Sequence, residues 1–186
     1  VDADLARMAA APVGLSRPLL VLAGWRAPLW PSMFLAQHLA RLVGDHSRRV
    51  EALAFTSCTT LESAVLRVPR YIDRLWPSSN PDRTVEVDIV GISMGGLIAR
   101  AAAIPSPGRK QVAIGRLFTL GTPHRGARIA PYIPWEPLVQ GMRPGSTFLK
   151  SLDDHLAEAA YDLRCYARLR DSWVGAVNTS PPGRDP

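Results

Sequence analysis

The stretch that decides the fold reads Val85-Glu86-Val87-Asp88-Ile89-Val90-Gly91-Ile92-Ser93-Met94-Gly95-Gly96, and an apolar, Ala-rich run from Leu97 to Ile104 follows it directly. Residues 85–90 predict a buried strand, and the Ala-rich run predicts a buried helix. The turn between them is so tight that Ser93 has to adopt strained backbone angles. Side chains at positions 91 and 95 would collide with neighbouring backbone, so both are glycine.

The pattern Gly91-x-Ser93-x-Gly95 is typical of a nucleophilic serine on a sharp strand-to-helix turn. The strain lifts the serine oxygen clear of the C-terminal edge of the sheet, and the helix N-terminus adds positive potential for a developing oxyanion. A bare match is only moderately specific, and its alternative is a Gly-rich turn that merely packs a helix on a strand. The strand directly before and the helix directly after the motif favour the nucleophile.

Outward from this turn, apolar strands alternate with amphipathic helices, which predicts a three-layer α/β fold with a mostly parallel sheet in one domain over residues 1–186. Ser32 is the expected cap of the first helix, and Thr59 with Glu62 forms the expected capping box of the second, which Pro69 should kink or split. The expected strands are 18–23, 49–55, 85–90, 115–120 and 163–169, and the expected helices are 32–43, 59–75, 97–104 and 147–160. The Pro-rich residues 127–145 suggest a cap or lid over the sheet, and residues 178–186 read as loop.

Three segments carry a family resemblance. Residues 87–100, Leu120-Gly121-Thr122-Pro123-His124-Arg125-Gly126-Ala127 and Met142-Arg143-Pro144-Gly145-Ser146-Thr147-Phe148-Leu149 resemble bacterial triacylglycerol lipases and GPI inositol-deacylase-like members of the α/β-hydrolase superfamily. The likeness covers about residues 19–174 and departs at Ile92, where these lipases usually carry His. It implies a carboxylic-ester hydrolase, a lipase or esterase, that acts on an acyl ester or lipid through an acyl-enzyme on Ser93, without a metal or organic cofactor.

The same resemblance assigns the remaining site residues. Acyl transfer needs two N–H donors for the oxyanion, and the fold implies the amides of Met94 and of Trp25 in the loop after the first strand. The alternative for Trp25 is a pocket wall only. The acid implied is Asp171, in the segment Asp171-Ser172-Trp173-Val174, with a solvated loop carboxylate as the alternative. Asp88 inside a strand is expected to be structural, and Asp153 and Asp154 to be surface residues of a helix.

The base is missing from the predicted triad. The triad residues of this fold occur along the chain in the order Ser, Asp, His, and no His follows Asp171. His38 is expected in a helix beside the core, His46 in a polar loop and His155 on a charged helix, and the resemblance implies that His124 is not the base. We therefore expect the sequence to lack the last helix, strand and His loop of the fold. The alternative is an inactive relative that has lost the base, as a lipid-binding or partner-binding module, and a further rival is an acyltransferase that uses the same serine.

The composition excludes several classes of protein. The net charge is +6, but the arginines are scattered and form no basic stripe with aromatics, so we expect no nucleic-acid partner. Attraction to an anionic membrane or lipid surface is favoured over nucleic acid, and no obligate protein partner is inferred. Cys58 and Cys165 lack CxxC spacing and predict two buried thiols. No apolar run is long enough to cross a bilayer and the start does not resemble a signal peptide, which leaves the localisation open, with the cytoplasm as the default.

Overall fold

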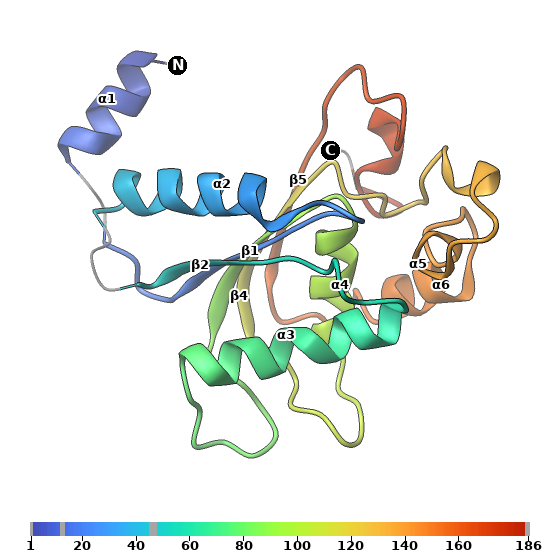
Figure 1. The fold of residues 1–186 in the computed structure, drawn as a ribbon, viewed down its shortest axis with the longest axis horizontal. Coiled ribbons are helices and arrows are strands. Elements are labelled where there is room, and N and C mark those ends of the chain that lie inside the picture. Colours follow the sequence, from blue (N-terminus) through green and yellow to red (C-terminus); the bar gives the residue numbers. More distant parts are fainter. Residues whose placement is uncertain (1, 12–13, 45–47, 185–186) are drawn as a thin grey trace.

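The computed structural model describes residues 2–11, 14–44 and 48–184 and contains a five-stranded, all-parallel sheet (Figure 1). The strand order is β2-β1-β3-β4-β5. The strands are β1 (Leu19–Leu22), β2 (Val50–Leu53), β3 (Val87–Ile92), β4 (Ile114–Leu120) and β5 (Asp162–Tyr166). Every strand lies within about two or three residues of its predicted position, and the predicted α/β class with a mostly parallel sheet is confirmed.

Helices cover both faces of the sheet, which gives the predicted three layers. The α-helices are α1 (Asp2–Ala10), α2 (Leu29–Leu42), α3 (Leu61–Leu75), α4 (Met94–Ala103), α5 (Pro137–Gln140) and α6 (Thr147–Asp154), and short 3-10 turns are η1 (Ala130–Tyr132) and η2 (Ala176–Asn178). Alternate residues of β1 point to opposite layers, because a strand has a side-chain period of two. Leu20 and Leu22 join the core under α3 and α4, whereas Leu19 and Val21 join the core under α2. None of the described helices is both long and apolar enough to cross a membrane.

The helix boundaries correct the sequence prediction in several places. Helix α2 begins three residues before Ser32, with Pro28 at the N-cap, and Ser32 is buried inside the helix rather than capping it. Helix α3 is continuous through Pro69 and is not split. Helix α6 ends at Asp154 rather than near residue 160, and α1 was not predicted. Of the expected loops, the position of His46 and the last two residues of the tail lie outside the described residues.

The capping box of α3 lies one residue later than predicted. Thr60, not Thr59, is the N-cap, and its side chain accepts a hydrogen bond from the Ser63 amide at 3.1 Å. The Ser63 hydroxyl accepts in turn from the Thr60 amide at 3.2 Å. Ser63 thus takes the place assigned to Glu62, because the box requires the partner three residues after the cap.

Residues 127–145 pack onto the main core through several buried apolar side chains. Ala130, Leu138, Val139 and Met142 are all at most 4% exposed and belong to the same core as α3 and α4. The Ala127 amide donates to the Met142 carbonyl at 2.8 Å, which closes the segment into a compact unit. The segment contains the short elements η1 and α5 joined by turns, as its Pro-rich sequence predicted an irregular structure.

Replacing Thr60 with Ala should lower the free energy of unfolding by about 1 kcal/mol, because the change leaves a helix N-terminal amide without its side-chain acceptor. Thr59→Ala is the matched control, since the adjacent threonine makes no cap bond, and it should change stability by less than about 0.5 kcal/mol. Urea denaturation of both variants measures the difference. Equal losses of stability in the two variants would show that Thr60 is not the cap of α3.

Candidate active site

Ser93 takes the strained backbone conformation that the sequence predicts. Its φ of 50° and ψ of −122° place it outside the regions that side-chain-bearing residues prefer, and it is the N-cap of α4. Its amide donates to the Leu120 carbonyl at 2.9 Å, and its carbonyl accepts from the Thr122 hydroxyl at 2.8 Å. The surrounding chain therefore holds the strain in place, and the partly exposed side chain lies at the C-terminal end of β3.

The two predicted glycines of the turn are required by close backbone approach. A Cβ on Gly91 would lie 2.6 Å from the Gly96 nitrogen, and a Cβ on Gly95 would lie 2.5 Å from the Leu22 carbonyl oxygen. Real Cβ atoms do not approach backbone that closely. The start of α4 therefore packs directly on the C-terminal end of β1, and any side chain at position 95 would force the helix away from the strand.

The loop after β1 lies directly against Ser93. Strands β1 and β3 are neighbours whose connections leave in opposite directions, and ligands of α/β sheets bind at such a switch point. A Cβ on Gly24 would lie 3.2 Å from the Ser93 Cβ, and Trp25 follows Gly24. Among the described residues no acceptor binds the backbone N–H of Trp25 or of Met94. The two amides predicted as oxyanion donors thus have no described acceptor: Met94 follows Ser93, and Trp25 follows Gly24, which lies against it. The Trp25 ring packs against the main core.

A side-chain ion pair ties the Trp25 loop to residues 127–145. The Arg26 guanidinium lies 2.9 Å from the carboxylate of Glu136, the N-cap of α5, whose side chain is only 11% exposed. Arg26 itself has a φ of 50°. The pair fixes the position of the loop that carries the Trp25 amide relative to α5.

Ser93 and Asp171 line one cavity of about 590 Å³. Asp171 lies in the loop after β5, where its Oδ1 accepts hydrogen bonds from the amides of Trp173 and Val174, both at 2.9 Å. Its Oδ2 lies 3.5 Å from a Cβ position on Gly121 and accepts no hydrogen bond from the described residues. The other lining residues are Ile92, Leu120, Gly121, Tyr166, Ala167, Arg168, Arg170, Ser172, Trp173 and Val174. The fold therefore brings the predicted nucleophile and acid to the same hollow.

The other candidate carboxylates have different surroundings. Asp88 is 7% exposed, accepts from the Arg116 amide at 2.9 Å and lies near Arg17, which agrees with a structural role. Asp153 is not a plain surface residue as predicted, because its carboxylate lies 3.0 Å from the guanidinium of the buried Arg100. Asp154 is exposed.

His124 is buried in a polar cluster and does not line the cavity of Ser93. The Arg100 guanidinium donates to its Nδ1 at 2.9 Å, so the neutral ring carries its proton on Nε2, which donates to the Thr119 hydroxyl at 3.1 Å. Burial, and then the charge of Arg100, lower the pKa of His124 to about 3. Cys165 lies 3.7 Å from the same Nε2, and it and Cys58 are free, half-buried thiols. His124 has no exposed surface and both of its ring nitrogens are hydrogen-bonded, so it is a structural residue of the core.

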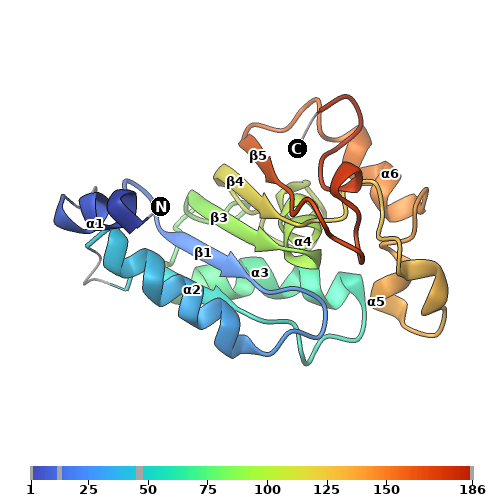
Figure 2. The same cartoon turned by 90° about the horizontal axis from the view of Figure 1, so that it is seen from above.

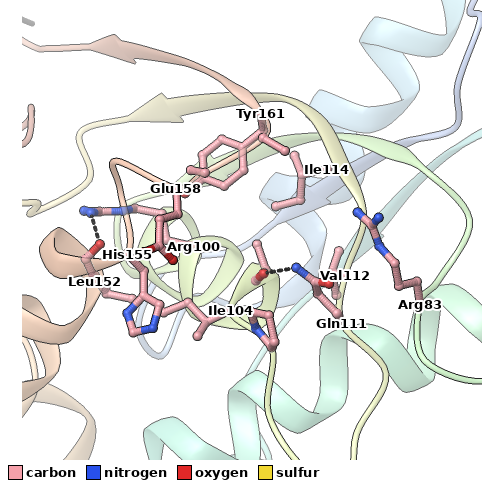
Figure 3. A pocket seen from close by; sticks show the side chains of 14 residues that line it. Arg83, Arg100, Ile104, Gln111, Val112, Ile114, Leu152, His155, Glu158 and Tyr161 are labelled. Atoms are coloured by element: carbon pink, nitrogen blue, oxygen red, sulfur yellow. Dashed lines mark hydrogen bonds between the residues drawn. The ribbon is translucent and has the colours of Figure 1, made fainter.

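Among the residues that the structure describes, no histidine lines the cavity that holds Ser93 and Asp171. His38 is exposed on α2, not beside the core as predicted. His155 lines a separate cavity of about 140 Å³ with Ala103, Ile104 and Tyr161, at the opposite end of α4 from Ser93 (Figure 3). The ten residues of α4 separate the two ends by roughly 15 Å. His46 lies outside the described residues.

Sequence comparison assigns the family. The model of the family described as PGAP1-like alpha/beta domain matches residues 39–132, about half of the chain. The chain belongs to this family. The PGAP1-like match includes Ser93 and Met94 but neither Trp25 nor Asp171. None of the curated proteins matches the chain.

Solved structures share the fold of this PGAP1-like domain. The mature form of the Bacillus licheniformis lipase BlEst2 is 15% identical, with a TM-score of 0.62 over 92% of this chain and 82% of that chain. The propeptide form of the same lipase is 17% identical, with a TM-score of 0.62 over 92% of this chain and 45% of that one. The phospholipase PlaB of Legionella pneumophila, in complex with thio-NAD, is 12% identical, with a TM-score of 0.56 over 89% of this chain and 44% of that one. At these identities the likeness shows the fold alone. Together with the PGAP1-like match over residues 39–132, it agrees with the predicted α/β-hydrolase type of fold.

The polar cluster of Arg100, His124 and Asp153 was not predicted from the sequence. Arg100 is 1% exposed, and it also donates to the Leu152 carbonyl at 2.8 Å. The available signal was one arginine in an otherwise apolar helix, since a buried cation has to be paired. The residues that pair it come from loops and helices far along the chain, which no local pattern identifies.

The buried neutral His124 should make the stability of this domain depend on pH. Its pKa of about 3 in the folded state lies below the ordinary 6.5, so the unfolded chain binds more protons between these values. The free energy of unfolding should therefore fall by about 1.4 kcal/mol per pH unit as the pH drops below 6.5. Urea denaturation between pH 6.5 and pH 5 measures this slope.

His124→Asn keeps an acceptor for Arg100 and removes the titrating ring, so its slope over the same range should be flatter by most of that amount. His38→Asn removes an exposed imidazole instead and should keep the wild-type slope. The interpretation fails if the two variants have the same slope.

Proposed function

We propose that this PGAP1-like domain is a carboxylic-ester hydrolase of the lipase or esterase type, with Ser93 as the nucleophile. One observation carries the proposal: a strained serine at a sheet switch point opens into the same cavity as a carboxylate from another loop. The unpaired amides of Met94 and Trp25 beside it support an oxyanion site.

In the proposed mechanism, the Ser93 oxygen attacks the carbonyl carbon of the ester while an imidazole base accepts the hydroxyl proton. The amides of Met94 and Trp25 donate to the oxyanion of the tetrahedral intermediate, and the N-terminus of α4 adds positive potential. The intermediate collapses to an acyl-enzyme, and the base returns its proton to the departing alcohol. Water then attacks the acyl-enzyme with the same base, which releases the acid and restores Ser93.

Asp171 is the proposed orienting acid for that imidazole. Two backbone amides hold its Oδ1, which fixes the carboxylate, and its Oδ2 is left without a described donor. An imidazole N–H that donates to Oδ2 would be fixed in one tautomer with its other nitrogen toward Ser93.

The proposed substrate is an acyl ester with an apolar acyl part. Residues 127–145, the proposed cap, expose Tyr132 and Trp135, and the cavity includes Trp173 and Val174. The names of two structural neighbours, a lipase and a phospholipase, support a lipid ester as the substrate class.

A fluorophosphonate probe tests the nucleophile. The probe should label the chain at Ser93, because it reacts with serine hydroxyls that are activated beside an oxyanion site. Ser93→Ala should reduce labelling at least about a hundredfold. Ser57→Ala is the control, because Ser57 is an exposed serine in the loop after β2 that does not line the cavity, and it should keep full labelling. Mass spectrometry of the labelled peptide identifies the site, and a probe found on another serine would refute the assignment.

None of the described residues that line the cavity is a histidine, which favours one second candidate, a non-catalytic lipid-binding or partner-binding relative. Added imidazole separates the two. If the chain is a hydrolase that lacks only the base at this site, neutral imidazole should enter the cavity of about 590 Å³ and accelerate labelling of Ser93 by at least about tenfold.

The acceleration should follow the neutral fraction of imidazole as the pH is changed, and Asp171→Asn should reduce it, since the acid would no longer orient the ring. A Ser93 that stays unlabelled with and without imidazole would favour the binding module. Fast labelling that imidazole does not change would mean that the chain already has its base.

A further inference from the structure

Among the side chains whose exposure the structure describes, the large apolar ones that face solvent are gathered at one edge of the molecule. Ten of them are exposed, from 40% at Leu29 to 91% at Leu169. All ten lie in three segments, residues 29–34, 132–135 and 166–177. They are Leu29, Trp30, Met33, Phe34, Tyr132, Trp135, Tyr166, Leu169, Trp173 and Val177.

Each of these segments follows the C-terminal end of a strand, namely β1, β4 and β5. The strands are parallel, so these ends meet at a single edge of the sheet (Figure 2). Ser93 follows β3 at the same edge. A random scatter of exposed apolar residues is ordinary on a protein surface, whereas their concentration at the edge that holds the cavity of Ser93 marks a contact surface.

The first segment presents an aromatic pair with no cover from the described chain. Trp30 and Phe34 are 61% and 62% exposed and contact each other edge to face, with ring centroids 6.0 Å apart. They project from the first turns of α2, near the loop that carries Trp25. Aromatic rings of this kind favour the boundary between water and an apolar phase.

The charge at this edge defines what can cover it. Residues 23–34, 121–145 and 166–177 contain six arginines and two acids. Of the two acids, Glu136 is paired with Arg26, and the Oδ1 of Asp171 is bonded to backbone amides. Arg168 and Arg170 flank Leu169 and are exposed at the mouth of the cavity. Apolar side chains interleaved with cations fit a surface that offers both acyl chains and negative headgroups.

We propose that this edge docks on the surface of a bilayer that carries anionic phospholipid, with Trp30, Phe34, Leu169 and Trp173 inserted at the headgroup level and Arg168 and Arg170 facing the phosphates. Docking in this orientation turns the cavity of Ser93 toward the lipid. The delivery of an ester to Ser93 from that surface rests on the proposed function, whereas the docking does not.

Sedimentation with sucrose-loaded vesicles tests the docking. The chain should bind vesicles of phosphatidylcholine with about 30 mol% phosphatidylserine, and should bind pure phosphatidylcholine at least about tenfold more weakly. Raising the salt concentration should weaken binding to the anionic vesicles, because the arginine contacts are screened. Equal binding to both vesicles, or none to either, would overturn the proposal.

Two sets of variants separate the apolar and the charged contributions. The pair Trp30→Ser and Phe34→Ser, and separately Leu169→Ser, should each lower the partition coefficient on anionic vesicles by about tenfold or more. The pair Arg168→Gln and Arg170→Gln should lower it roughly thirtyfold. The matched control is the pair Arg83→Gln and Arg116→Gln, which removes the same charge from exposed arginines away from this edge and should bind within about threefold of wild type. If the control pair lowers the partition coefficient as much as the Arg168 and Arg170 pair does, net charge alone explains the effect and the proposal is overturned.

Two further measurements keep the docking distinct from catalysis and from self-association. Ser93→Ala should bind anionic vesicles as tightly as wild type, so failure of Ser93 labelling with intact vesicle binding would refute only the proposed function. Light scattering of the lipid-free chain gives the oligomeric state. If the chain is a dimer, if the Trp30→Ser and Phe34→Ser substitutions dissociate that dimer, and if no vesicle binding is seen, the edge would instead bind a second copy of the chain.

Discussion

The close backbone approach between the end of β1 and the start of α4 is the constraint on which the site depends. A Cβ on Gly95 would lie 2.5 Å from the Leu22 carbonyl oxygen and 2.7 Å from that of Ala23, so only glycine permits this packing. Because α4 then begins directly over the end of β1, the Ser93 side chain lies beside the loop of Gly24 and Trp25. One contact therefore places the proposed nucleophile, the Met94 amide and the positive end of a buried helix beside the loop that carries the Trp25 amide.

The segment that follows β4 reinforces this turn from the other side. The Thr122 hydroxyl donates to the Ser93 carbonyl at 2.8 Å, and Gly96 leaves room for it, since a Cβ there would lie 2.9 Å from the Thr122 methyl. Two residues later, His124 accepts from Arg100 on α4. The two sequence motifs around Ser93 and His124 are thus one packed unit, in which the histidine is a neutral core residue and its burial is the reason that it cannot serve as the base.

The elements that the sequence predicted best are those that a short stretch of neighbouring residues identifies. Strand β1 is a continuous apolar run, and β3 is apolar apart from Asp88 and Gly91. The Gly91-x-Ser93-x-Gly95 pattern spans only five residues, directly after the apolar part of β3. The predicted start of α2 at Ser32 lies three residues too late, because the helix includes Pro31. A proline in the first turn loses only an amide that has no helical partner there. The Arg100 cluster and the cavity shared by Ser93 and Asp171 could not be read from local patterns, because they depend on how loops after β4 and β5 come together. Family resemblance, rather than spacing, singled out Asp171.

The geometry at residue 93 weighs against a purely structural role for the turn. A non-glycine residue at a φ of 50° with a ψ of −122° carries a cost of order 1–3 kcal/mol, which a glycine would largely avoid. A module that only binds lipid or protein gains nothing from a serine there. The carboxylate of Asp171 is held by two backbone amides and needs no imidazole to keep its place. The proposed nucleophile and the proposed acid are thus both positioned without a base, and the cavity that they line has room for an imidazole.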